Sequence, residues 1–178
     1  MFDSYYRFHK VGVDKAHYKK YLKEIVTYSF KSANHYYLVE VEVYVADIYI
    51  IKFYLKKDKR NPIKYNILTK ENRSSKVIST CIRIMLQIHA DNPLASFGFL
   101  GSPIIDKETG YHESRATTKR FMLYRRAMYA LFGTKTFTHY IDMQHSAYLM
   151  VNNKNQSVED VKNSARKMFN EIFPELED

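Results

Sequence analysis

A strict alternation of apolar and polar residues constrains the fold of this chain more than any other feature. Residues 39–45 read Val-Glu-Val-Glu-Val-Tyr-Val, and residues 51–56 read Ile-Lys-Phe-Tyr-Leu-Lys. A period of two residues is typical of a strand that buries one face. Asp47 lies between the two segments, so we expect them to form an antiparallel pair. We expect a third short strand over residues 63–68.

Four other segments have the period of an α-helix. We expect a first helix over 15–29 with Asp14 as its N-cap, a second over 76–90, a third over 117–132 that ends at Gly133, and a last one from Ser157 to Pro174. The second helix is apolar around most of its circumference, which predicts a central, buried position. Segment 94–100 is expected to be a strand, and 137–151 a strand or a hairpin.

The expected order is therefore helix, three strands, helix, strand, helix, strand, helix. This order indicates an α+β fold, with a single mixed, mostly antiparallel sheet and helices packed on its faces. The length of 178 residues and a hydrophobic content of 46% suffice for one core. We therefore expect a single domain spanning residues 1–178.

The chain is basic, with 28 Lys and Arg against 19 Asp and Glu and a net charge of +9. Residues 1–70 hold 14 basic and 7 acidic side chains and residues 71–135 hold 10 and 5, whereas residues 136–178 hold 4 and 7. A basic body suits a polyanionic partner or an acidic protein surface. A lysine-rich coat that only maintains solubility explains the same excess of charge.

Two segments gather the cations that are best placed to bind anions. On a helical wheel of 117–132, Lys119 and Arg126 lie about 20° apart, and Arg115 joins them if the helix begins early. Arg120 and Arg125 flank the apolar stripe of this helix. Arg73 and Lys76 bracket the start of helix 76–90, where free backbone N–H groups favour anions. The alternatives are a solvated helix face and simple N-capping by Ser74 or Ser75.

The core from about residue 36 to 150 resembles that of the GCN5-related N-acetyltransferases. The resemblance rests on the order of elements and on Leu123-Tyr124-Arg125-Arg126, because the corresponding helix of that family carries a Leu-Tyr followed by basic residues. It implies a degenerate acetyltransferase-like fold, with Tyr124 as a general acid. The pyrophosphate-binding turn of the family would fall on 71–76, where this chain has no glycine. Ala127-Met128 replaces the family's Gly-Phe.

The sequence lacks the residue patterns of other common catalytic and metal sites. The single cysteine, Cys81, excludes an intrachain disulfide and a multi-cysteine metal site, and its apolar neighbours predict an inert core thiol. His139 and His145 are six residues apart without a completing ligand. His112-Glu113 could perform acid–base chemistry in a loop. We expect no metal and no cofactor.

These observations favour a non-catalytic basic binding protein that acts on RNA, DNA or a nucleoprotein complex. An inhibitor from a phage or mobile element that acts on a host nucleoprotein nuclease fits this profile. The alternatives are a divergent acyl-CoA-dependent N-acyltransferase that uses Tyr124 and a small RNase that uses His112 and Glu113. No signal peptide or membrane span is visible, so we expect a cytoplasmic protein. The sequence does not indicate an oligomeric state.

Overall fold

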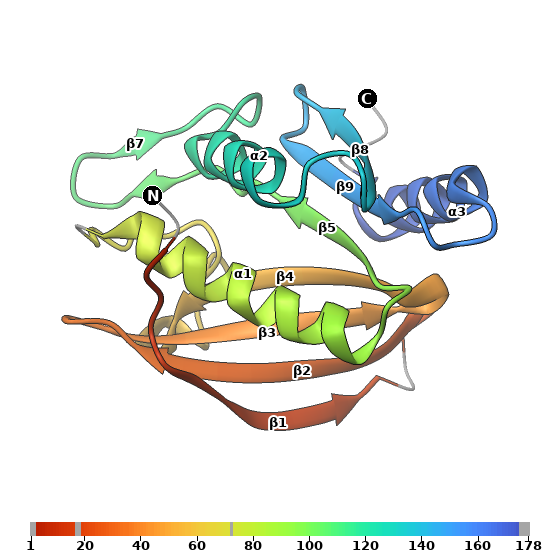
Figure 1. Ribbon diagram of the computed structural model, residues 1–178. Coiled ribbons are helices and arrows are strands. Elements are labelled where there is room, and N and C mark those ends of the chain that lie inside the picture. Colours follow the sequence, from red (N-terminus) through yellow and green to blue (C-terminus); the bar gives the residue numbers. More distant parts are fainter. Residues whose placement is uncertain (1–2, 17–18, 72, 175–178) are drawn as a thin grey trace.

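The computed structural model describes residues 3–16, 19–71 and 73–174. It has an α+β fold with a seven-stranded, mostly antiparallel sheet and three helices (Figure 1). The strands of the sheet are β1 (Phe8–Lys15), β2 (Leu22–Lys31), β3 (Tyr36–Tyr44), β4 (Ile48–Leu55), β5 (Ser96–Leu100), β8 (Phe137–Asp142) and β9 (Ala147–Asn152). The helices are α1 (Ser74–Asp91), α2 (Lys119–Phe132) and α3 (Val158–Ile172). A separate small hairpin consists of β6 (Ile105–Asp106) and β7 (Tyr111–His112).

The strand order in the sheet is β1-β2-β3-β4-β5-β9-β8. Neighbouring strands are antiparallel except β4 and β5, which α1 connects. The predicted antiparallel pair is confirmed, with Val41 opposite Ile51 in β3 and β4. The expected mixed, mostly antiparallel sheet is therefore present.

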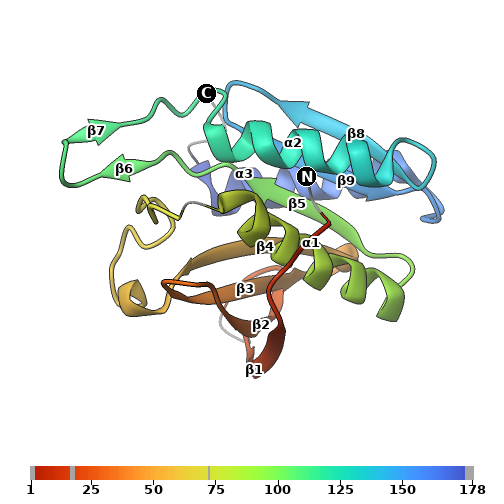
Figure 2. The same cartoon turned by 60° about the vertical axis from the view of Figure 1, so that its left-hand side comes forward.

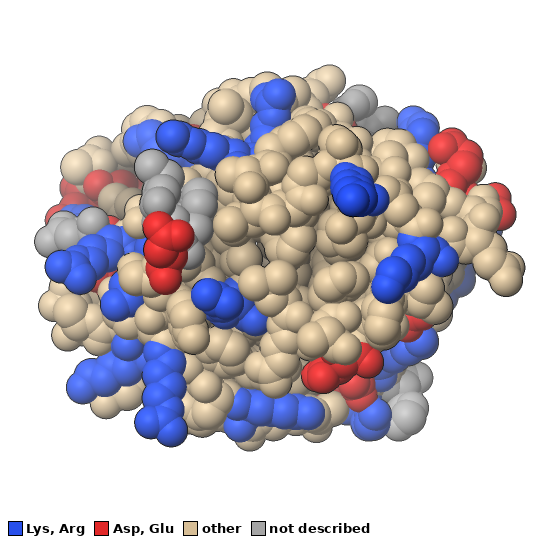
Figure 3. Space-filling view, viewed as in Figure 1, with Lys and Arg blue, Asp and Glu red and all other residues tan. Residues whose placement is uncertain are grey.

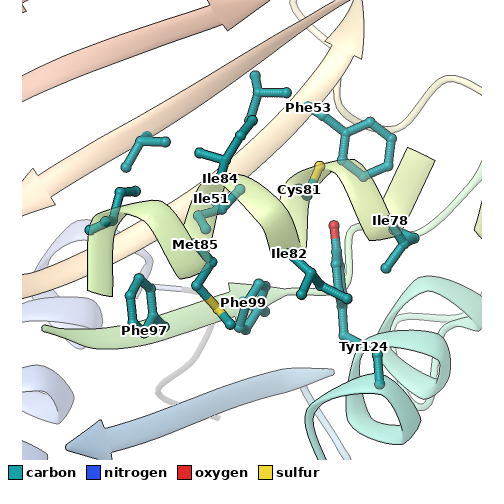
Figure 4. Close-up of a cluster of buried hydrophobic side chains, with 14 of the residues drawn as sticks. Ile51, Phe53, Ile78, Cys81, Ile82, Ile84, Met85, Phe97, Phe99 and Tyr124 are labelled. Atoms are coloured by element: carbon teal, nitrogen blue, oxygen red, sulfur yellow. The ribbon is translucent and has the colours of Figure 1, made fainter. Parts of the chain in front are cut away.

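Helix α1 lies across the middle of the sheet, as its apolar circumference predicted (Figure 2). Ile84 and Met85 are fully buried, and they pack among side chains from β4, β5 and α2 (Figure 4). Helix α2 belongs to the same core, so α1 and α2 cover one face of the sheet. Helix α3 packs on the opposite face with Tyr44, Ile48 and Val151.

Two helix ends were predicted correctly from capping residues. Gly133 is the C-cap of α2 and has a φ of 56°, a left-handed conformation that glycine adopts without steric cost. The Ser157 side chain accepts a hydrogen bond from Asp160 N at the start of α3. Among the described residues, no helix combines the length and apolar character needed to span a bilayer.

The prediction of a first helix over 15–29 is wrong. Most of this segment forms β2, which pairs with β1 on one side and β3 on the other. Val26, Tyr28 and Phe30 point into the core, and this alternation determines the strand. Residues 17–18 lie outside the described part of the chain. The strand β1 was not predicted.

The expected strand over 63–68 is also absent. This segment consists of turns, and its one ladder contact is a parallel bridge between Ile67 and Ile105. Asn61 begins the turns, because its side-chain oxygen accepts a hydrogen bond from Ile63 N at 3.1 Å. The segment therefore joins β4 to α1 as an irregular connection. This connection lies beside the candidate site described next.

Candidate functional site

The starts of α1 and α2 meet at one hollow of the molecule. Ser74 of α1 and Lys119 of α2 line the same hollow, which has a volume of about 240 Å³. Arg73 is the N-cap of α1, and its side chain makes no capping hydrogen bond. Neither Ser74 nor Ser75 caps the helix, because both lie inside it. The capping alternative for these serines is therefore wrong.

Lys76 lies one turn into α1, next to the N-terminal segment of the chain. Its ammonium is 4.4 Å from the centre of the Tyr6 ring, a cation–π contact. Tyr6 N donates a hydrogen bond of 2.9 Å to Thr80 Oγ1, which holds this segment against α1. Arg83, two turns beyond Lys76, lies 4.7 Å from the Tyr5 ring centre. The exposed side of α1 is therefore a mixed surface of cations and tyrosine rings.

Helix α2 exposes Lys119 and Arg126 on its outer side. Met122 and Tyr129 are each 44% exposed on the same helix. Arg125 is half-buried, and its guanidinium donates a hydrogen bond to Met143 Sδ at 3.5 Å. Arg115 is exposed before the helix begins. In the space-filling view of the face that carries α1 and α2, blue Lys and Arg side chains predominate over red acidic ones (Figure 3).

Arg120 does not belong to this exposed surface, because its side chain is largely buried. Its guanidinium donates hydrogen bonds to the carbonyl oxygens of Tyr65 and Ile67, the latter at 3.1 Å. It also lies 5.2 Å from the ring centre of Phe53. Burial lowers the pKa of this guanidinium, which is satisfied by carbonyls instead of a carboxylate. Arg120 therefore holds the connection between β4 and α1 in place.

A second hollow opens where the two parallel strands diverge. The pairing of β4 with β5 extends only from Ile48 opposite Ser96 to Ile50 opposite Gly98. Beyond it lies a hollow of about 310 Å³, which is lined in part by Lys52, Arg115, Arg120, Tyr124 and His145. Two of the cations on its lining already have partners, since Lys52 is paired with Glu42 and Arg120 binds backbone carbonyls.

The connection between β4 and α1 closes one side of this opening. Leu68 N donates to Ile105 O at 3.3 Å, and Ile105 N donates to Asn66 O at 2.8 Å. The Asn66 side chain donates to Pro103 O at 2.9 Å. These bonds link the connection to the segment that follows β5.

Tyr124 lies in the core. It is 3% exposed, and its ring centre is 4.8 Å from that of Phe99. Its hydroxyl points toward α1, near Cys81 (Figure 4). Burial raises the pKa of this phenol, so it keeps its proton at neutral pH. Burial also raises the pKa of the Cys81 thiol to about 12, in agreement with an inert cysteine.

A polar cluster on the opposite face of the sheet was not predicted. Glu40 accepts hydrogen bonds from the Tyr54 hydroxyl at 2.6 Å, from the Tyr65 hydroxyl, and from Lys64 Nζ at 3.2 Å. Glu42 pairs in the same way with the Tyr44 hydroxyl and Lys52. The alternation of 39–45 signalled that both glutamates share one face, but the partners come from other segments.

The histidines singled out in the sequence lie apart from one another in the described part of the chain. Both Glu113 oxygens accept backbone N–H groups, from Ile104 and Lys119, each bond within 2.9 Å. Glu113 therefore fastens the β6–β7 hairpin to the start of α2, and His112 is exposed. His139 lies on β8, whereas His145 lies in the turn before β9 and pairs with Asp142. The described residues contain no group of three potential metal ligands.

Comparison of this chain with protein-family models, with curated proteins and with solved structures finds no match. The functional argument therefore rests on the geometry and charge of the described residues.

Proposed function

We propose that the chain is a basic binding protein whose surface on α1 and α2 binds a polyanion, either a nucleic acid or the nucleic acid of a nucleoprotein complex. The observation that carries this proposal is the distribution of unpaired cations. Arg73, Lys76, Lys119, Arg125 and Arg126 form no ion pair with any carboxylate of the described residues.

The ion pairs of the described residues use other cations. They involve His145 and the lysines Lys15, Lys20, Lys52, Lys64, Lys70 and Lys162. An unpaired exposed cation keeps its full interaction with a phosphate and releases a condensed counterion when it binds. The cations on α1 and α2 are therefore available for a polyanion.

The spacing of these cations supports the same proposal. Lys119 and Arg126 are seven residues apart on α2, or about 10 Å along the helix axis. Arg73 adds charge at the neighbouring start of α1. The exposed Met122 between these cations, and Tyr129 one turn beyond Arg126, can contact sugars and bases. Several phosphates of one strand can then be contacted at the same time.

The test is the affinity of the purified protein for labelled single-stranded RNA and duplex DNA, measured by fluorescence anisotropy at several salt concentrations. For each phosphate contact we expect a log–log slope of about −0.7 for single strands and about −0.9 for duplex DNA. The double variant Lys119→Glu, Arg126→Glu should bind at least tenfold more weakly, with a shallower slope. A260/A280 and mass spectrometry of co-purified material distinguish a nucleic acid from a nucleoprotein.

The matched control is Lys56→Glu, Lys57→Glu, which makes the same charge change on exposed residues after β4. It should retain most of the affinity. If the α2 variant binds with unchanged affinity and salt dependence while the chain stays folded, the proposal is refuted. Equal losses in both double variants would also refute it, because they would indicate a response to net charge alone.

A divergent acyltransferase is the second candidate, favoured by one observation. The hollow of about 310 Å³ lies between the parallel strands β4 and β5, next to the helix with Leu123-Tyr124-Arg125-Arg126. The buried Tyr124 hydroxyl, the bonds that fasten segment 65–68 and the glycine-free start of α1 weigh against it. We expect acetyl-CoA to bind no better than millimolar, and a micromolar dissociation constant by calorimetry would favour the acyltransferase instead.

A further inference from the structure

The largest of the hollows described for this protein lies on the face of the sheet opposite α1 and α2. It runs between α3 and the strands β5, β9 and β8, and its volume is about 520 Å³. We call it the α3 groove. A volume of this size is typical of sites for small molecules. The α3 groove is separate from the basic surface on α1 and α2.

The floor of the α3 groove is apolar and combines small residues of β5 and β9 with larger aliphatic side chains. Gly98 and Ala147 lie on neighbouring strands, with Leu100 and Leu149 next to them. A Cβ atom at Gly98 would lie 2.4 Å from Ile50 Cδ1 and 3.6 Å from Phe169 Cζ. The Phe169 ring therefore rests close to the floor and forms part of the wall. Such a surface can hold a hydrocarbon chain.

The wall formed by α3 is polar and cationic. Lys162, Arg166 and Asn170 are spaced by four residues, so they form one row along the groove. Lys162 Nζ lies 4.7 Å from the Tyr140 ring centre and 3.2 Å from Glu159 Oε1. Arg166 has no ion pair with a carboxylate among the described residues. Its guanidinium can therefore bind a carboxylate through two parallel hydrogen bonds, in a bidentate geometry.

Among the described residues, Asp142 is the one carboxylate that lines the α3 groove, and it already has a hydrogen-bond partner. Asp142 Oδ2 is 2.8 Å from His145 Nδ1, and Asp142 Oδ1 accepts the His145 backbone N–H at 3.1 Å. Burial alone would raise the pKa of Asp142, but the hydrogen bonds from His145 outweigh it and lower the pKa. Lys162 already has Glu159 as an ion-pair partner, so the charge left for a ligand is mainly the positive charge of Arg166.

We propose that the α3 groove binds a small amphipathic carboxylate, with its hydrocarbon chain on the floor and its carboxylate at Arg166 and Lys162. Charge complementarity selects this ligand class over a neutral or cationic amphiphile. The proposal does not depend on the proposed polyanion surface, since the two sites lie on opposite faces of the sheet.

The test uses 11-(dansylamino)undecanoate, a fluorescent carboxylate, with decanoate and 1-decanol as competitors below their aggregation limits. We expect saturable binding to the full chain, displaced by decanoate and at least tenfold less effectively by 1-decanol. Arg166→Glu should weaken binding at least fivefold. Lys167→Glu makes the same charge change on the neighbouring exposed residue of α3 and should change it less than twofold.

Ala147→Leu fills the floor of the groove and should weaken probe binding at least tenfold. If this variant fails to fold, the comparison of Arg166→Glu with Lys167→Glu still decides the question. Absence of saturable binding, equal competition by 1-decanol, or equal losses in the two charge variants would each overturn the proposal. The variant Lys119→Glu, Arg126→Glu should bind the probe normally, which separates this site from the polyanion surface.

Discussion

Replacing Glu40 with Gln tests whether the polar cluster beneath β3 and β4 stabilises the fold. The carboxylate is 16% exposed and accepts hydrogen bonds from two tyrosine hydroxyls and one lysine. Gln keeps the size of the side chain but replaces one acceptor oxygen with a donor. It also leaves Lys64 without its counter-charge. The substitution therefore removes charge while leaving the packing of the strand unchanged.

The size of the effect follows from these three contacts. Hydrogen bonds to a charged group contribute about 1.5–3 kcal/mol each, against about 0.5–1.5 kcal/mol for neutral ones. Gln can still accept one hydroxyl, so the loss is smaller than the sum of the three bonds. We expect Glu40→Gln to lower the free energy of unfolding by about 2–3 kcal/mol at pH 7.

The sign of the pH dependence provides a further check. Burial alone would raise the pKa of Glu40, but the Tyr54 and Tyr65 hydroxyls and Lys64 outweigh it and lower the pKa. A carboxylate with a lowered pKa in the folded state stabilises the protein above its ordinary pKa of about 4.3. This stabilisation is lost as the pH falls through the folded-state pKa. The difference between wild type and Glu40→Gln should therefore shrink below about pH 4.

The assay is urea unfolding of both proteins between pH 7 and pH 3. Glu24→Gln is the matched control, because Glu24 lies on the adjacent strand β2 and has one exposed partner, Lys15. It should cost less than about 1 kcal/mol. The reasoning would be refuted by an unchanged midpoint for Glu40→Gln at pH 7, or by a difference that grows as the pH falls.

Two further predictions concern packing. Met85 is fully buried in the middle of α1, so Met85→Ala should lower the free energy of unfolding in urea by about 2–5 kcal/mol. Gln87→Ala, on the exposed side of α1, should lower it by less than about 0.5 kcal/mol. Equal losses in the two variants would contradict a central position of α1. A Cβ at Gly101 would lie 2.5 Å from Phe121 Cβ and 2.9 Å from Phe121 N. Gly101→Ala should therefore lower the free energy of unfolding by about 1–3 kcal/mol, which is measured as a lower thermal midpoint. Gly12→Ala adds its methyl group to open space, and a similar loss for both glycine variants would refute the close approach of α2 to Gly101.

Local patterns were sufficient to predict the central elements of the fold. The alternation of 39–45 requires one face in the core, and Val39, Val41 and Val43 are all buried in β3. A helix that is apolar around its circumference must be covered on several sides, and α1 is covered by the sheet and by α2. These predictions succeeded because a single segment carries the whole signal.

The segment 15–29 was misread because two periods compete there. Leu22 and Ile25 fit a helix, whereas Val26, Tyr28 and Phe30 fit a strand. Pairing with β1 and β3 decides for the strand. Because a strand is stabilised by residues distant in sequence, its local pattern is weaker evidence than the pairing itself.

The charge of the chain and the inert Cys81 were apparent from the sequence, as was the position of the cations on two helices. Only the tertiary structure distinguished Arg120 from its neighbours Lys119 and Arg126. The carbonyls that Arg120 binds belong to Tyr65 and Ile67, more than 50 residues earlier in the chain. Helical periodicity determines which side of α2 a residue occupies. Whether that residue meets water or an unpaired carbonyl depends on which distant segment packs there, and the sequence of the helix does not contain that information.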